Sequence, residues 1–335
     1  MRVVSLEERR PRISVCVPTI GRTEFLASTR SSISAQTFED FEVLVLDNAS
    51  NADARAIVED WAATDARVRV LRVEERIPMF ENFNRGIRAA RGEYLTFCHD
   101  DDLVAPRFLE HQVSFLDRNP SVGFVGSNYE YVDETGAVTE LRTPVRQTET
   151  WRGKRYIRAL MRSGRNPLTM QSIVYRRSAI DPDGFDLSLP IHYGDFVLLM
   201  RMAERCDVGL VAEPLVQVRR HAAQASSALP LSRGMALRRE VLGRYLDELA
   251  ARWPDEKGLL RELRASLTLA HRTGSLWGWV SAGDAKEAAA CVEGLGQTPI
   301  DVMLALAART VDRVAPPTSA RRRALVAAAL RVANG

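Results

Sequence analysis

The segment GEYLTFCHDDDLVAPRFLE, residues 92–110, decides the fold of the chain. It opens with an apolar run of the kind that forms a strand covered on both faces. The run ends at three consecutive carboxylates, Asp100, Asp101 and Asp102. Carboxylates this close repel one another unless a positive charge lies among them. The segment therefore predicts a buried strand whose carboxyl end carries a polar site that needs a cation.

Two earlier runs have the same character. ISVCVPT begins at Ile13, and FEVLVLDNAS begins at Phe41 and passes into Asp47 and Asn48. Both are continuous apolar runs that finish in polar residues, as parallel strands buried on both faces do. Open α/β sheets bind their ligands beyond the carboxyl ends of the strands, so the three polar ends are predicted to meet in one crevice.

The order of strand-like and helical patterns indicates the fold class. The alternation continues to about Val218, which predicts an α/β fold with a Rossmann-like, mostly parallel sheet flanked by helices. The turn sequence DETG, residues 133–136, separates two alternating runs and predicts a hairpin, so the sheet is expected to be mixed. Beyond about Ser227 only helical spacing remains. We expect one sheet domain in residues 1–227 and an α-helical C-terminal extension in residues 228–335.

Composition and charge limit the classes of function. Of the 335 residues, 46% are hydrophobic and 27% are charged, which is ordinary for a globular protein and excludes a disordered chain. The net charge of +3 gives no reason to expect a nucleic-acid partner.

Cysteine spacing and hydropathy bear on the compartment. The four cysteines are far apart and match no zinc or redox motif, which favours free thiols in a reducing compartment. The N-terminal sequence MRVVSLEERRPR has no apolar signal region, and no window reaches about 18 uninterrupted apolar residues. We expect a cytoplasmic protein.

The three aspartates allow two interpretations. In one, they form an Asp-rich turn in which one carboxylate caps the next helix. In the other, they hold Mg²⁺ or Mn²⁺, which bind one or two protein carboxylates and fill their other positions with water and phosphate oxygens. Three carboxylates in a row favour the metal and phosphate site.

Several motifs, taken in order, resemble the family 2 glycosyltransferases with the GT-A fold. The resemblance covers roughly residues 11–227. The motifs are PTIGR at 18–22, LDNAS at 46–50, RGEYLTFCHDDDLVAP at 91–106, GD at 194–195 and RRH at 219–221. It implies an inverting enzyme that moves a sugar from a nucleotide-diphosphate donor, most often a UDP-sugar, to a hydroxyl group of a glycan or small-molecule acceptor.

The same resemblance implies which residues bind the nucleoside. Thr19, Arg22 and Asp47 match positions that line the nucleoside pocket, where Asp47 is expected to read the uracil ring. Asn82 and Asn84 fall in the Asn-containing helix that flanks this pocket in the family.

The metal and phosphate positions follow from the same motifs. His99-Asp100-Asp101 stands in place of the family's DxD motif, which implies that Asp100 faces the ribose and that Asp101 binds Mn²⁺ or Mg²⁺. His99 is a departure, because many members carry aspartate there. His221 matches a position near the diphosphate, with Arg219 as a second candidate.

Asp195 has two readings. Taken from the local sequence, it caps a helix that runs from Phe196 to Arg205. The family resemblance instead implies that Asp195 is the catalytic base that removes the proton of the acceptor hydroxyl, with Gly194 in place of the usual glutamate.

Other readings of the chain stay open. A nucleotidyltransferase also uses metal-binding aspartates on a Rossmann-like sheet, but VPTIGRTEF is poor in the glycine and basic residues of a triphosphate loop. A non-catalytic module that binds nucleotide sugars is a second alternative. In the extension, a basic helix in residues 319–335 suits a homodimer contact or peripheral contact with the inner membrane face.

Overall fold

In the computed structural model, the protein is described for residues 10–221, 229–281, 286, 287, 290 and 291. The chain divides into two compact units. Among the described residues, the first unit comprises 10–157 and 166–221, and the second comprises 158–165 together with those from 229 onward.

The first unit is built on a ten-stranded mixed sheet with the order β3-β2-β1-β4-β9-β6-β10-β5, to which β7 is added beside β6 and β8 beside β10. The strands are β1 Ile13–Thr19, β2 Phe41–Asn48, β3 Val68–Val73, β4 Tyr94–Phe97, β5 Leu103–Val104, β6 Val122–Val132, β7 Val138–Arg142, β8 Glu149–Trp151, β9 Val174–Arg176 and β10 Asp207–Arg219. The longest pairings, β1 with β2, β2 with β3 and β6 with β10, are parallel. The α/β class and the mixed, mostly parallel sheet that the sequence predicts are confirmed.

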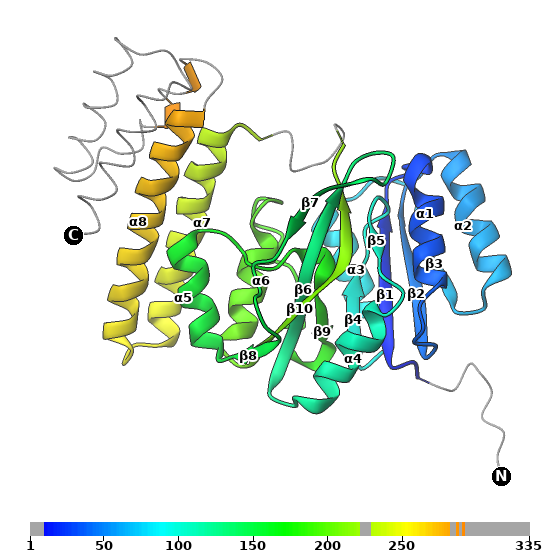
Figure 1. Cartoon of the computed structure of the whole chain (residues 1–335), viewed down its shortest axis with the longest axis horizontal. Coiled ribbons are helices and arrows are strands. Elements are labelled where there is room, and N and C mark those ends of the chain that lie inside the picture. Colours follow the sequence, from blue (N-terminus) through cyan, green and yellow to red (C-terminus); the bar gives the residue numbers. More distant parts are fainter. Residues whose placement is uncertain (1–9, 222–228, 282–285, 288–289, 292–335) are drawn as a thin grey trace. The chain divides into compact units, whose positions relative to one another are not determined.

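Helices connect the strands. They are α1 Thr23–Ser34, α2 Ala52–Thr64, α3 Met79–Ala89, α4 Phe108–Arg118, α5 Gly153–Ser163 and α6 Gly194–Ala203, with the 3₁₀ turns η1 Met170–Ser172 and η2 Arg177–Ala179. Figure 1 shows α1 and α2 next to the strands β1 to β3 at one end of the sheet.

The two faces of the sheet are covered by different helices. Ile13, Val15 and Val17 alternate along β1 and belong to a hydrophobic core that includes buried side chains of α1, α2 and α4. The intervening residue Cys16 faces α3, where a Cβ on Gly86 would lie 3.0 Å from the Cys16 sulfur. Because β1 is buried on both faces, its sequence is a continuous apolar run rather than an alternating one.

Gly92 differs from a helix-ending glycine. It does not end the helix before β4, because α3 ends at Ala89 with Ala90 as its C-cap. A Cβ on Gly92 would lie 2.6 Å from the backbone nitrogen of Ser14. Glycine is needed here because the chain entering β4 passes against the backbone of β1.

The hairpin predicted at DETG is present. β6 and β7 pair antiparallel, and Gly136 has φ +89°, a left-handed conformation that favours glycine. β9 also runs antiparallel between β4 and β6, and it therefore separates the two parallel parts of the sheet.

The second unit contains two long helices, α7 Leu231–Arg252 and α8 Lys257–Ser281, in the region where only helical spacing is expected. Buried residues on α7 follow helical spacing, among them Val241, Tyr245 and Leu249. The predicted basic helix in residues 319–335 lies outside the described residues. Among the described helices, none combines the length and hydropathy that crossing a bilayer requires.

Candidate active site

Strand register brings the polar strand ends together. Thr19, the last residue of β1, pairs in parallel with Asp47, one residue before the end of β2. Cys16 pairs with Phe97, so the residues that follow β4 run alongside the end of β1. The side chains that follow β1, β2 and β4 therefore share one edge of the sheet, as the three polar strand ends predict.

Asp100 is held by the loop after β1. Its Oδ2 accepts a hydrogen bond from the Thr19 hydroxyl at 2.7 Å, and its Oδ1 lies 3.1 Å from Nη1 of Arg22. The side chain is buried, and burial raises the pKa of Asp100, with the charge of Asp101 acting in the same direction. Thr19 and Arg22 therefore offset repulsion that the buried carboxylate would otherwise experience.

The side chains of Arg22 and His221 converge on Asp101. Its Oδ2 lies 3.0 Å from Nη1 of Arg22 and 2.9 Å from Nε2 of His221. Arg22 thus bridges Asp100 and Asp101 with one nitrogen. Arg22 supplies a positive charge among the aspartates from within the chain, and His221 is a second polar partner of Asp101.

Asp102 is satisfied on one side only. Its Oδ1 accepts a hydrogen bond from the backbone N–H of Arg219 at 2.9 Å, whereas its Oδ2 is buried without a hydrogen-bond partner among the described residues. Nδ1 of His99 lies 3.8 Å from Oδ2. Burial, and then the charge of Asp101, raises the pKa of Asp102 well above its ordinary value, while burial lowers the pKa of His99.

The residues around Asp102 form a candidate cation site. His99, Asp101 and Asp102 each offer one ligand atom, and these atoms lie within 4.8 Å of one another. Imidazole nitrogen and carboxylate oxygen are suitable ligands for Mn²⁺ and related divalent ions. His99 replaces the first aspartate of the DxD motif and is itself a candidate metal ligand.

Arg219 acts on the backbone around the aspartates. Its Nε donates to the carbonyl oxygen of Asp101 at 3.0 Å, and its Nη1 donates to the carbonyl oxygens of Asp133 and Glu134 at 2.9 and 3.0 Å. The guanidinium also lies 4.7 Å from the ring centre of Phe25. Arg219 therefore ties the aspartate loop to the tip of the β6–β7 hairpin.

Asp47 forms a second, separate cluster at the same edge. Its Oδ1 accepts from the backbone N–H of Ser50 at 2.9 Å, and its Oδ2 accepts from Nε of Arg72 at 2.7 Å. Burial works to raise the pKa of Asp47, but the hydrogen bonds from Ser50 and Arg72 outweigh burial and lower it. Asp47 is therefore an ionised hydrogen-bond acceptor. Arg72 was not predicted as a site residue; only the β2–β3 register, which pairs Asp47 with Arg72, identifies it.

The two asparagines of α3 hold backbone. Asn82 donates to the carbonyl oxygen of Leu46 at 3.0 Å, one residue before Asp47. Asn84 exchanges two hydrogen bonds with the backbone of Phe185, both of 2.8 Å. Both amides are thus in use within the chain, and a direct role for either in nucleoside binding stays a prediction.

Asp195 lies at the start of α6. The helix begins at Gly194 with Tyr193 as its N-cap, so Asp195 is the second helical residue and not the cap that the local sequence predicts. Burial raises the pKa of Asp195 to about 6, while backbone N–H groups of the first turn act in the opposite direction. Its charge contributes to raising the pKa values of Tyr156 and Tyr175, after the larger effect of their own burial.

Gly194 has no room for a side chain. A Cβ at this position would lie 2.2 Å from Cε2 of Phe80. Phe80 in turn stacks on Phe185 with ring centres 4.8 Å apart, and Asn84 fixes the backbone of Phe185. This chain of contacts explains why glycine precedes Asp195 in this protein and shows how α3 supports the start of α6.

The predicted site residues therefore fall into distinct groups. One group is connected by direct contacts to Asp100 or Asp101 and comprises these two aspartates with Thr19, Arg22 and His221. Asp47 forms its own cluster at the same sheet edge, and Asn82 and Asn84 bind backbone. Asp195 lies on a different element, α6, where its charge acts on Tyr156 and Tyr175.

A Rossmann-like mixed sheet with a run of buried aspartates at the carboxyl ends of its strands is the architecture of the GT-A glycosyltransferases. The sequence model described as "Glycosyl transferase family 2" matches residues 14–182. The chain belongs to this family, and the resemblance drawn from its motifs is confirmed.

Curated relatives support the same class. An uncharacterized glycosyltransferase of Methanocaldococcus jannaschii is 29% identical over 134 residues, which cover 39% of this chain and 46% of the relative. A UDP-Glc:alpha-D-GlcNAc-diphosphoundecaprenol beta-1,3-glucosyltransferase of Escherichia coli is 22% identical over 240 residues, covering 72% of this chain and 88% of the relative. The chain spans 46% of the length of the M. jannaschii protein. It spans 59% of the length of three uncharacterized proteins from Mycobacterium that it also resembles.

Solved structures share the fold at low sequence identity. TarS 1-349 of S. aureus in complex with UDP-GlcNAc has a TM-score of 0.64 at 17% identity, covering 85% of this chain and 80% of the TarS 1-349 chain. The mannosyltransferase PcManGT of Pyrobaculum calidifontis, in complex with GDP-Man and Mn²⁺, has a TM-score of 0.54 at 18% identity, covering 97% and 86% of the two chains. The chain therefore has the GT-A fold, in agreement with its family.

Proposed function

We propose that the protein transfers a sugar from a UDP-sugar donor to a hydroxyl acceptor, with inversion at the anomeric carbon and with Asp195 as general base. The buried aspartate run, contacted by Arg22 and His221 at the carboxyl ends of the strands, is the observation that carries the proposal. A nucleotide diphosphate is the ligand that such a site suits, because it brings phosphate oxygens to a divalent cation and to basic side chains.

The uracil assignment rests on Asp47. An ionised carboxylate only accepts hydrogen bonds, so it selects a base with a ring N–H, such as uracil. Two related proteins named above act on or bind UDP-sugars, which favours the same base here. GDP-mannose in PcManGT makes the guanine nucleotide the main competitor to be tested.

Asp101, with His99 and Asp102 beside it, would hold the divalent metal. When bound, the metal stabilises negative charge on the leaving diphosphate as a Lewis acid. Arg22 and His221 lie on Asp101 and can contact the same phosphate oxygens once the donor is present. Thr19 orients Asp100 by its 2.7 Å hydrogen bond, as a residue that faces the ribose requires.

Asp195 is suited to remove the acceptor proton. A pKa of about 6 keeps the carboxylate ionised at neutral pH and makes it a stronger base than an ordinary aspartate. Its place in the first turn of α6, with Phe80 packed against Gly194, fixes the backbone that carries it. A single base acting on the acceptor, with no covalent intermediate, gives inversion.

Thermal unfolding with UDP, TDP, GDP or CDP, each with Mn²⁺ or with a chelator, tests the donor site. A ligand at about 100 times its Kd adds roughly 2.7 kcal/mol to the free energy of unfolding. We expect UDP with Mn²⁺ to stabilise the protein and Asp101→Ala to lose this response. Glu39→Gln is the matched control, because Glu39 is an exposed carboxylate at the opposite end of β2. Stabilisation by no diphosphate would contradict the proposal and favour a module without turnover.

The proposal assigns the reaction to residues 1–227 and to the cytoplasm. All four cysteines are free, which suits a reducing compartment. We further propose that the helical extension in residues 228–335 serves peripheral membrane contact or dimerisation. Membrane sedimentation and light scattering of the full chain, compared with a chain ending near Pro316, separate the two. A monomer that stays in the supernatant in both forms would reject both roles.

A further inference from the structure

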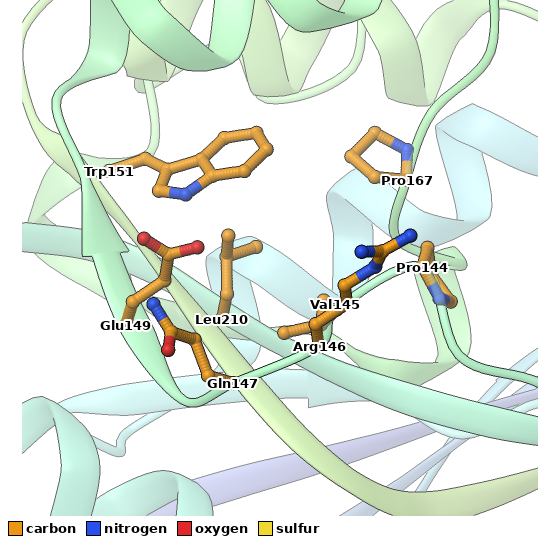
Figure 2. A pocket seen from close by; sticks show the side chains of 8 residues that line it. All are labelled: Pro144, Val145, Arg146, Gln147, Glu149, Trp151, Pro167 and Leu210. Atoms are coloured by element: carbon orange, nitrogen blue, oxygen red, sulfur yellow. The ribbon is translucent and has the colours of Figure 1, made fainter.

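A pocket lies on the first unit, on β8, β10 and the segments next to them. Its volume is about 340 Å³, at the small end of the roughly 300–1,000 Å³ range of small-molecule sites. None of the residues predicted to serve the transfer reaction lines it. Figure 2 shows Trp151 and Pro167 along one side of the pocket, Arg146 and Gln147 along the other, and Leu210 between them.

Apolar side chains form one part of the pocket. The indole of Trp151 and the ring of Pro167 form the walls, and the buried side chains of Leu210 and Val145 form the floor. The indole nitrogen Nε1 is buried and has no hydrogen-bond partner among the described residues. A buried indole N–H normally finds an acceptor, so a ligand with an oxygen near this atom would complete the site.

The polar groups at the rim both donate and accept. Arg146 offers guanidinium donors, Glu149 offers a carboxylate acceptor, and Gln147 offers an amide that does both. Nη1 of Arg155, a residue that does not line the pocket, lies 3.1 Å from Oε2 of Glu149 and reduces the charge at the rim. This combination suits hydroxyl groups, which also donate and accept, better than it suits a phosphate or an ammonium group.

The walls are held in place before any ligand binds. The guanidinium of Arg155 lies 4.2 Å from the ring centre of Trp151. Asn128 exchanges hydrogen bonds of 2.8 and 3.0 Å with the backbone of Val145 and also binds the backbone of Ala212 on β10. Asn166 accepts hydrogen bonds from the hydroxyl of Tyr156 and the backbone N–H of Leu168. These bonds hold the two residues that flank Pro167. A pre-formed site loses little conformational entropy on binding.

We propose that this pocket binds a neutral saccharide unit, with the C–H face of the sugar ring on Trp151 and the hydroxyl groups at the rim. An indole plane beside groups that donate and accept hydrogen bonds fits a sugar ring, which is apolar on its faces and polar at its edge. Under the proposed transferase function, on which this second step rests, the unit belongs to the acceptor glycan and lies away from the reacting hydroxyl. Pro167 begins the segment that reaches Gln171, whose Nε2 lies 3.3 Å from Nδ1 of His99.

Indole ¹⁵N–¹H spectra of the full chain test the proposal directly. The probes are cellobiose, lactose and N,N′-diacetylchitobiose at up to about 50 mM, which would saturate a site of millimolar affinity. Sorbitol, a polyol without a ring face, is the control. We expect the indole signal of Trp151, assigned with Trp151→Phe, to move in a saturable way with at least one disaccharide and not with sorbitol.

Two variants locate the binding. Gln147→Ala removes a rim side chain at an exposed position and is expected to weaken disaccharide binding about two- to tenfold, the effect of one lost hydrogen bond. Trp277→Ala removes an exposed tryptophan of α8 and should leave the affinity unchanged. A Trp151 signal that stays fixed with every disaccharide, or that moves equally with sorbitol, would overturn the proposal. UDP titration of the same samples reports on the donor site independently, so failure of one site is distinguished from failure of the other.

Discussion

Nε2 of His221 and Oδ2 of Asp101 lie 2.9 Å apart although the two residues are 120 positions apart in the chain. The same oxygen of Asp101 is contacted by Arg22, which comes from the loop after β1. Three distant segments thus meet on one carboxylate, and Arg22 balances part of its charge.

His221→Ala is expected to weaken UDP binding about 10- to 100-fold, because a hydrogen bond to a charged group contributes about 1.5–3 kcal/mol. Isothermal titration calorimetry with UDP measures the loss. Uridine, which lacks the diphosphate, is the control ligand and should bind as it does to the unchanged protein. An equal loss for uridine and UDP would place His221 away from the phosphates.

Asp195→Asn is expected to lower the rate of sugar transfer by about 10²- to 10⁴-fold, the usual contribution of a general base. The affinity for the donor should change little, since Asp195 acts on the acceptor. Single-turnover transfer and donor titration separate the two effects. Near-normal transfer by this variant would remove Asp195 from the mechanism.

The rate of transfer should depend on pH through Asp195. Because only the ionised carboxylate accepts the proton, kcat is expected to fall as the pH decreases through about 6, the pKa of this group. The rate should approach a plateau above neutral pH. A rate that stays constant down to the ordinary aspartate pKa of 3.8 would contradict the raised pKa.

The stability of the Asp195→Asn variant gives a second, independent readout. The pKa of Asp195 is raised in the folded protein, so its contribution to stability is present below the unfolded pKa and is lost as the pH rises through about 6. Removing the charge should therefore stabilise the fold above neutral pH by on the order of 1–3 kcal/mol, and not below about pH 4. Urea unfolding at both pH values measures the difference. Equal stability of the two proteins above neutral pH would show that the buried charge of Asp195 does not destabilise the fold.

Gly194→Ala should destabilise the protein by about 1–3 kcal/mol, because its Cβ would overlap the ring of Phe80. Phe80→Ala removes that ring. Gly194→Ala should therefore cost less in a protein that already carries Phe80→Ala than in the unchanged protein. A double-mutant cycle measured by urea unfolding gives the coupling between the two sites. Additive effects would mean that Phe80 does not restrict position 194.

Arg219→Met should cost about 2–4 kcal/mol, since it leaves the carbonyl oxygens of Asp101, Asp133 and Glu134 without a buried charged donor. Arg220→Met is the matched control. Arg220 is about half exposed and pairs with Glu140 at the surface, so its loss should cost less than about 1 kcal/mol. Similar losses in the free energy of unfolding for both variants would show that Arg219 does not stabilise the contact between the aspartate loop and the hairpin.

The sequence alone determined the sheet, the family and which polar residues lie at the carboxyl ends of β1, β2 and β4. Strands buried on both faces are continuous apolar runs, and their polar ends are adjacent in the chain to the strands that position them. Thr19, Asp47 and Asp100 could therefore be assigned to one edge, because parallel strands place their carboxyl ends together.

Only the tertiary structure decided which groups form hydrogen bonds with the carboxylates and which carboxylate oxygens have no partner among the described residues. Arg72 reaches Asp47 through the register of a neighbouring strand, and Arg219 spans two loops, so neither partner follows from local sequence. The raised pKa of Asp195 and the need for Gly194 depend on what packs against α6. Burial and contact between distant segments set these properties, and a linear pattern carries no information about either until the chain is folded.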